Sequence, residues 1–144
     1  TKGGATPLMG AAQKNKNPEV LQTLINANAK INKVNDIGFT PLIYASSYNT
    51  NPEFTIRLIK AGADVNFVNK FGRSVFIYAA LNNENVEILR ILLDNGADYM
   101  HRDNNGMTAF DIMKQEGKIS PDSEVYKFLG EIEANGYQKR SVTP

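Results

Sequence analysis

Hydrophobic and polar positions along the chain return in the same order every 34 residues. A stretch made of a glycine, a variable residue, a hydroxyl residue and then apolar residues occurs four times, beginning at Gly4, Gly38, Gly72 and Gly106. Self-similarity at a fixed period of this length is typical of stacked supersecondary units that share one elongated core. The period divides the chain into four expected units and a C-terminal tail: 1–34, 35–68, 69–102, 103–136 and 137–144.

Each unit is predicted to open with a tight turn followed by a short helix. In the second unit, Asn35 stands at the first turn position and Gly38 at the fourth, which is the composition of a type I turn. A hydroxyl residue that can cap a helix follows in every unit: Thr6, Thr40, Ser74 and Thr108. The residues after it are apolar and small, as expected for a helix that is covered on several sides.

A second helix is predicted after a polar connector. Asparagines at Asn17, Asn51 and Asn85 can cap its start, and glutamate follows two positions later, where the helix dipole favours it. The helix is expected to end at residues that adopt the left-handed conformation readily: Asn28, Gly62 and Gly96. Two extended residues then lead into the next turn and suggest one arm of a hairpin.

These features resemble ankyrin repeats. The resemblance is carried by Gly-x-Thr-Pro-Leu at 4–8 and 38–42, by Gly-Ala-Asp-Val-Asn at 62–66, and by three alanines in register: Ala11, Ala45 and Ala79. It implies an all-α repeat solenoid, an ankyrin-like stack of four helix-turn-helix units joined by β-hairpin fingers, whose concave face binds other proteins. The period exceeds the family's roughly 33 residues by one connector residue. The histidine common after Thr-Pro-Leu is absent, and we expect apolar packing by its replacements: Met9, Ile43 and Ile77.

The two ends of the array are expected to differ. The last helix, near 123–135, has one charged face, as a terminal unit needs, and the Gln138-Lys139-Arg140 tail is expected to fray. The first unit has no comparable polar face, so part of its opening side is expected to be an exposed apolar surface. We therefore expect the chain to be the C-terminal part of a longer array; alternatively, a partner covers the first unit or it self-associates with a second copy.

Composition bounds the function classes. With 144 residues and 42% hydrophobic residues, the chain can bury a core as one domain. The net charge is +1 and both signs are mixed along the chain, which disfavours nucleic acid as a partner. No apolar run approaches the roughly 20 residues that span a bilayer, so no membrane partner is expected. The chain has no cysteine, which leaves the compartment open; a soluble cytoplasmic protein is favoured, and export stays open if a targeting segment was removed.

Candidate catalytic chemistry is sparse. His101 is the sole histidine and has no plausible nucleophile beside it, so a solvated loop residue is the favoured interpretation. Asp64 and Asp98 recur at the repeat period, which indicates a structural role in accepting backbone amides. We expect no enzyme, no cofactor and no metal; a hydrolase or transferase would need a buried pocket that joins His101 to two carboxylates.

The candidate partner-binding residues are aromatic, aliphatic and basic side chains at turn and first-helix positions. The family resemblance places such positions on the concave face, and these residue types are enriched at binding hot spots. They are Ile37, Phe39, Tyr48, Phe67, Phe71, Arg73 and Met107. We therefore expect a non-catalytic protein-binding module; the alternative is a structural or regulatory segment that packs on another domain of a larger polypeptide.

Overall fold

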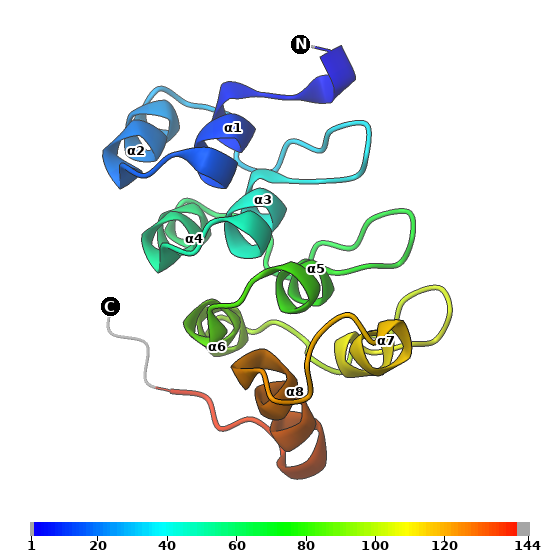
Figure 1. Ribbon diagram of the computed structural model, residues 1–144. Helices are drawn as coiled ribbons and strands as arrows, with labels where there is room; N and C mark the ends of the chain where they lie inside the picture. Colours follow the sequence, from blue (N-terminus) through cyan, green and yellow to red (C-terminus); the bar gives the residue numbers. More distant parts are fainter. Residues whose placement is uncertain (1, 141–144) are drawn as a thin grey trace.

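The computed structural model describes residues 2–140, in which eight α-helices stand in two columns (Figure 1). One column contains α1 (Pro7–Lys14), α3 (Pro41–Tyr48), α5 (Val75–Asn82) and α7 (Ala109–Glu116). The other contains α2 (Pro18–Asn26), α4 (Pro52–Lys60), α6 (Val86–Asp94) and α8 (Glu124–Asn135). Each helix packs on its neighbours in the same column and on the helix beside it. The loops that join α2 to α3, α4 to α5 and α6 to α7 project past the first column, and we call them fingers (Figure 1).

The helices begin and end where the local sequence predicts. The hydroxyls of the four first-column caps each accept a hydrogen bond of 3.2 Å from a backbone amide in the first turn. The amide oxygens of Asn17, Asn51 and Asn85 do the same for α2, α4 and α6, at 3.0 Å. Asn28 and Gly62 follow α2 and α4 with positive φ angles of 64° and 99°. The expected caps and helix ends are confirmed.

The core lies between the two columns. Its fully buried side chains include Leu8, Leu42 and Phe76 from the first column. Met9, Ile43 and Ile77 are also buried. Apolar packing is therefore found at the position where ankyrin-like sequences commonly have a histidine, as expected. At the C-terminal end, Phe128 and Ile132 of α8 face the core, while Lys127 and Glu131 are exposed on its other side.

The β-hairpin expected of each finger is not confirmed. Within residues 2–140 there is no strand, and the ladder pairing of the fingers is limited to one isolated antiparallel bridge between Val68 and Ser74. The turn itself is present, because the Gly38 amide donates to the carbonyl of Asn35 at 3.0 Å. The Oδ1 atom of Asn35 accepts from the amides of Ile37 and Phe39, at 3.2 and 2.9 Å. Side-chain hydrogen bonds thus hold amides that a longer hairpin would use for strand pairing.

A ladder of asparagines joins the connectors between the two columns. Asn49 Nδ2 donates to the carbonyl oxygens of Ala12 and Asn15, at 3.1 Å each. Asn83 Nδ2 donates in the same way to Ser46 and Asn49, at 2.9 and 3.1 Å. Both donors are buried. Each bond reaches the preceding helix pair, so the ladder fixes neighbouring pairs to one another.

A second ladder runs along the bases of the fingers. Asn32 Nδ2 donates to the Gly62 carbonyl at 3.1 Å, and its Oδ1 accepts from the Asp64 amide at 2.9 Å. Asn66 makes the equivalent pair of bonds one period later, to Gly96 and Asp98. The fingers are therefore anchored to the helix ends of the next pair as well as by their own turns.

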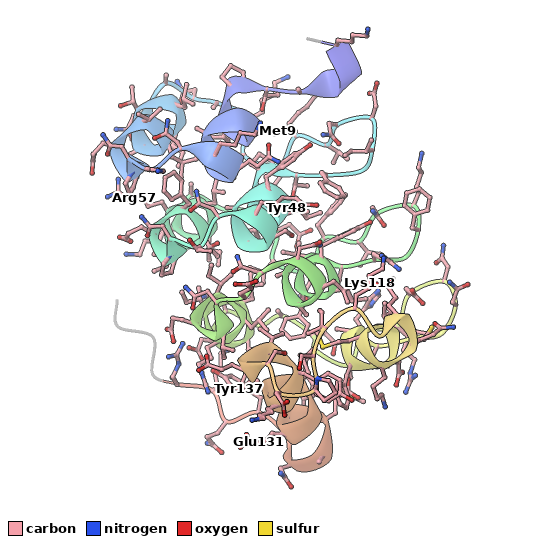
Figure 2. All side chains as sticks on the ribbon, viewed as in Figure 1. Met9, Tyr48, Arg57, Lys118, Glu131 and Tyr137 are labelled. Carbon is pink, nitrogen blue, oxygen red and sulfur yellow. The ribbon has the colours of Figure 1, made fainter. Side chains whose placement is uncertain are left out.

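The expected fraying of the tail is wrong for Arg140. The chain turns back after α8, with Tyr137 beside that helix (Figure 2), and reaches the buried Asp94 of α6. Arg140 Nε donates to Asp94 Oδ2 at 2.7 Å, while the Arg140 amide and the Tyr137 hydroxyl donate to Asp94 Oδ1 at 2.9 and 2.7 Å. The guanidinium also contacts Glu87 at 3.0 Å. A buried carboxylate at the end of α6 thus holds this segment, which local sequence does not reveal.

We expect Asp94→Asn to lower the free energy of unfolding by about 1–2 kcal/mol at pH 7, because a charge-assisted pair is lost and the half-exposed guanidinium is partly screened by water. Burial raises the pKa of Asp94, but the bonds from the Arg140 amide, Tyr137 and the Arg140 guanidinium outweigh it and leave that pKa lowered. A lowered folded-state pKa means that this stabilisation is present above the unfolded pKa of about 3.9 and is lost as pH falls through the folded value.

Urea denaturation of the wild type and Asp94→Asn between pH 7 and pH 2 measures this effect. The difference between the two proteins should shrink as the solution is acidified. Glu87→Gln is the control, since its pair with Arg140 is exposed on both sides, and it should change stability by about 0–1 kcal/mol. A difference between wild type and Asp94→Asn that is as large at pH 2 as at pH 7 would contradict the assignment.

Candidate binding site

A row of aromatic rings crosses the face where the fingers meet the first column. The ring centroids of Tyr48 and Tyr44 are 6.3 Å apart, those of Tyr44 and Phe39 are 5.4 Å apart, and those of Phe39 and Tyr78 are 4.8 Å apart. The guanidinium carbon of Arg73 lies 5.9 Å from the centroid of Tyr78. We call these five residues the aromatic stripe. It runs from the end of α3, where Tyr48 is labelled in Figure 2, to α5 and the α4–α5 finger.

Asparagines from the fingers orient two of the tyrosines. Asn35 Nδ2 donates to the Tyr44 hydroxyl oxygen at 2.8 Å, and Asn69 Nδ2 donates to that of Tyr78 at 2.7 Å. The Oδ1 atoms of the same two asparagines hold the turns of their fingers. Each asparagine therefore ties a finger to the helix that follows it, and the stripe is held in place before any partner arrives.

Tyr48 ends the stripe and is its most exposed tyrosine. Burial raises the pKa of its hydroxyl, and the neighbouring phenols of Tyr44 and Tyr78 add to that rise. The hydroxyl is therefore protonated at neutral pH, since the ordinary pKa of tyrosine is already about 10. It can donate a hydrogen bond into the space beside α3.

The seven predicted binding residues fall into two groups. Ile37, Phe71 and Tyr48 are exposed, at 56%, 53% and 44% of their surface. The other four are partly buried: Phe39, Phe67, Met107 and Arg73. Of these, the two phenylalanines and Met107 pack against the core. For Phe39 and Phe67 the sequence offered no core contact. The structure supplies one, because both rings pack against the buried core, and that of Phe39 also lies between Tyr44 and Tyr78.

Tyr44 and Tyr78 are the members of the stripe that the sequence analysis missed. Both follow a cap residue by four positions and stand 34 residues apart, and each lies nine positions after the asparagine that binds it. The repeated spacing between asparagine and tyrosine is the signal that could have identified them.

An open cleft lies at each end of the stripe. The cleft beside Tyr48, of about 410 Å³, includes Lys14, Lys16 and Asn51 in its lining. The cleft beside Arg73, of about 500 Å³, includes Phe71 in its lining, together with residues of the α6–α7 finger. The two clefts therefore flank the apolar surface of the stripe.

The sequence's candidate catalytic residues have structural partners. His101 Nε2 lies 2.8 Å from the Gly72 carbonyl oxygen, and because a carbonyl only accepts, this nitrogen carries the proton. His101 thus joins two fingers, where a solvated position was expected. Asp64 and Asp98 accept the amides of Asn66 and Met100, at 3.0 and 2.9 Å, as the sequence predicts. Over residues 2–140, no cluster of three or more acidic or histidine side chains could hold a metal ion.

Within the same described part of the chain, each helix is too short or too polar to cross a lipid bilayer.

Comparison with known proteins gives a family. A family model described as ankyrin repeats (3 copies) matches residues 46–135, and one described as ankyrin repeats (many copies) matches residues 8–59. Together the two matches extend from α1 to the end of α8. No curated protein matches the chain.

Proposed function

Because the chain belongs to the ankyrin repeat family, whose members are generally protein–protein interaction modules, we propose that it binds a protein partner without catalysing a reaction. The binding surface is the concave face formed by the fingers and the first-column helices, with α3, α5 and their fingers contributing most. The observation that carries this proposal is the aromatic stripe, in which Tyr48 is exposed, together with the exposed Ile37 and Phe71 of the fingers. Large apolar side chains exposed together are typical of interaction sites.

The chain binds through a surface whose side chains are already ordered before the partner associates. The asparagine–tyrosine bonds fix the stripe, and the two asparagine ladders fix successive fingers and connectors to one another. Association then orders few additional groups, so less of the interaction energy is lost to entropy. Exposed anchors such as Tyr48 and Phe71 provide contact area.

Replacing the exposed anchors should weaken partner binding while sparing the fold. In the triple variant Ile37→Ala, Tyr48→Ala, Phe71→Ala, each removed side chain is exposed, whereas Phe39 stays in place because it packs on two tyrosines. We expect the affinity for a protein partner to fall at least about tenfold, since aromatic anchors often contribute more than 1 kcal/mol each. Quantitative affinity purification from a source extract, followed by titration of the captured protein, measures the effect.

The matched control changes exposed residues of the second column, Val20→Ala with Lys60→Ala. Circular dichroism melting checks that all variants fold. Capture of the same proteins at the same affinity by wild type, triple variant and control would refute the concave face as the binding surface. Loss confined to the triple variant supports it.

A second candidate is that this segment packs on another domain of a larger polypeptide. An apolar cleft of about 310 Å³ at the α1–α2 end favours it, since its lining includes Leu8, Leu24 and Ala29. Val20 of α2 is exposed as expected, whereas Met9 and Leu21 are buried within the first helix pair. If the cleft instead joins two copies, sedimentation velocity will show a dimer whose population rises with concentration and falls in Leu24→Ser.

A further inference from the structure

Two lysines line the cleft at the Tyr48 end of the aromatic stripe. Lys14 and Lys16 are exposed, and within residues 2–140 neither ammonium lies within the 4.0 Å ion-pair distance of a carboxylate. The other described residues that line this cleft carry amides or hydroxyls and no carboxylate. The helix dipole favours a cation in the last turn of α1, where Lys14 lies, but Lys16 is beyond that helix. The cleft is therefore positive and rich in hydrogen-bond donors.

The opposite end of the stripe carries a guanidinium that is only weakly engaged. Arg73 Nε lies 3.9 Å from Asp103 Oδ2, which is longer than a hydrogen bond. Asp103 is buried, and its Oδ1 accepts from the amides of Asn105 and Met107, at 2.9 and 3.1 Å. Backbone donors therefore already satisfy much of that carboxylate. Lys70, whose Nζ lies 5.3 Å from the ring centroid of Phe71, adds a second positive charge on the same finger.

Between these ends the stripe offers apolar rings and hydroxyl donors. The hydroxyl oxygens of Tyr44 and Tyr78 accept from asparagine, so their own hydrogens must be donated elsewhere. Among the hydrogen bonds of residues 2–140, neither hydroxyl donates to a protein acceptor. An incoming carbonyl or carboxylate oxygen would supply one.

We propose that the concave face binds an extended acidic segment of the partner protein, with one carboxylate between Lys14 and Lys16 and a second at Arg73. Apolar or aromatic side chains of that segment lie along the stripe between the two carboxylates. The inference rests on the proposed function and adds the chemistry of the partner to it. Charge complementarity of this kind selects partners and speeds their encounter.

Nucleic acid is the other anionic polymer that cationic side chains could attract. Single-stranded nucleic acid is bound by exposed aromatic platforms on which successive bases stack. In the stripe, Tyr78 is buried and the ring of Phe39 lies between Tyr44 and Tyr78, so neither presents a free ring face on which a base could stack. The partly exposed Phe39 and Tyr44 and the exposed Tyr48 can still contact apolar side chains. An acidic peptide, whose side chains can enter the two clefts, fits the surface better.

Selection from a phage-displayed library of random 12-residue peptides tests the inference on the full chain. We expect the enriched peptides to carry at least two Asp or Glu residues separated by apolar or aromatic residues. The most enriched peptide is then synthesised with a fluorescent label, together with a copy in which every Asp and Glu is replaced by Asn and Gln. Fluorescence anisotropy should show at least tenfold weaker binding of the amide copy, and also weaker binding of the acidic peptide as salt rises.

The charge variant is Lys14→Gln with Lys16→Gln, and both positions are exposed, so the fold should be retained. It should bind the acidic peptide at least tenfold more weakly than the wild type does. The matched control, Lys60→Gln with Lys127→Gln, removes the same charge from exposed positions of α4 and α8 and should stay within twofold of the wild type.

The outcomes separate this inference from the proposed function. Enriched peptides that are neutral or basic but lose binding in the Tyr48→Ala variant would overturn the acidic segment and leave the concave face standing. Acidic peptides that bind the Lys14 and Lys16 double variant as tightly as the wild type would also overturn it. If a 12-nucleotide oligothymidine binds as tightly as the peptide, the partner is single-stranded nucleic acid and the acidic protein segment is overturned. Failure to enrich any peptide, or binding unaffected by Tyr48→Ala, would count against both proposals.

Discussion

Gly72→Ala is expected to destabilise the protein by about 2–5 kcal/mol, because the added methyl group meets both backbone strain and a close neighbour. Gly72 has a φ of 74°, where an L-residue is strained by about 1–2 kcal/mol. A Cβ at this position would also meet Asn104 of the next finger, at 2.6 Å from its backbone nitrogen and against its side-chain oxygen. The finger contact around it, in which Asn104 Nδ2 donates to the Lys70 carbonyl at 3.0 Å, would have to open.

Gly106→Ala is the matched control. Gly106 has nearly the same φ, 76°, but nothing within 4 Å of an added Cβ. This variant should lose only the conformational term, about 1–2 kcal/mol. Urea denaturation followed by circular dichroism gives both values. Equal losses in the two variants would show that the close approach of the fingers contributes nothing to stability.

Asn83→Ala should lower the free energy of unfolding by about 2–4 kcal/mol, because it leaves buried carbonyl groups without their donor. Asn83 Nδ2 bonds to two carbonyls of the preceding helix pair, and its Oδ1 accepts the amide of Asn85 at 2.9 Å. These contacts join the α3–α4 pair to the α5–α6 pair. In a repeat stack, weakening one such interface also reduces cooperativity, so the urea m-value should fall along with the midpoint.

Asn15→Ala is the matched control, because Asn15 occupies the same repeat position as Asn83. Among the described residues, no helix pair precedes the one to which Asn15 belongs, so its side chain makes no bond to such a pair. The Asn15 side chain makes one exposed hydrogen bond, from the amide of Asn17 at 2.8 Å. Its loss should destabilise the protein by about 0.5–1 kcal/mol and leave the m-value unchanged. If Asn83→Ala proves no more harmful than Asn15→Ala, the ladder does not couple the pairs.

The proposed binding surface was only partly predictable from sequence. Ile37, Tyr48 and Phe71 are exposed, as residues meant to contact a partner must be. Phe39 stands in the same kind of turn as Phe71, yet it packs between Tyr44 and Tyr78. Their positions within the turn differ, because Phe39 follows Gly38 whereas Phe71 precedes Gly72 and shares the register of the exposed Ile37. The rings that cover Phe39 come from α3 and α5, which only folding places beside it.

The sequence by itself determined the repeat, the caps and the helix ends. Thr40 and Asn51 start helices through hydrogen bonds to amides two or three positions away, and Gly62 ends one through its own positive φ angle. Such local effects can be predicted from a short stretch of sequence. The tertiary structure alone decided how the units are joined. The ladder bonds of Asn83 join residues 34 and 37 positions apart. The hydrogen bonds from Arg140 to Asp94 join residues 46 positions apart. Such contacts depend on distances that the stacked helices set, and these distances exist only once the chain has folded.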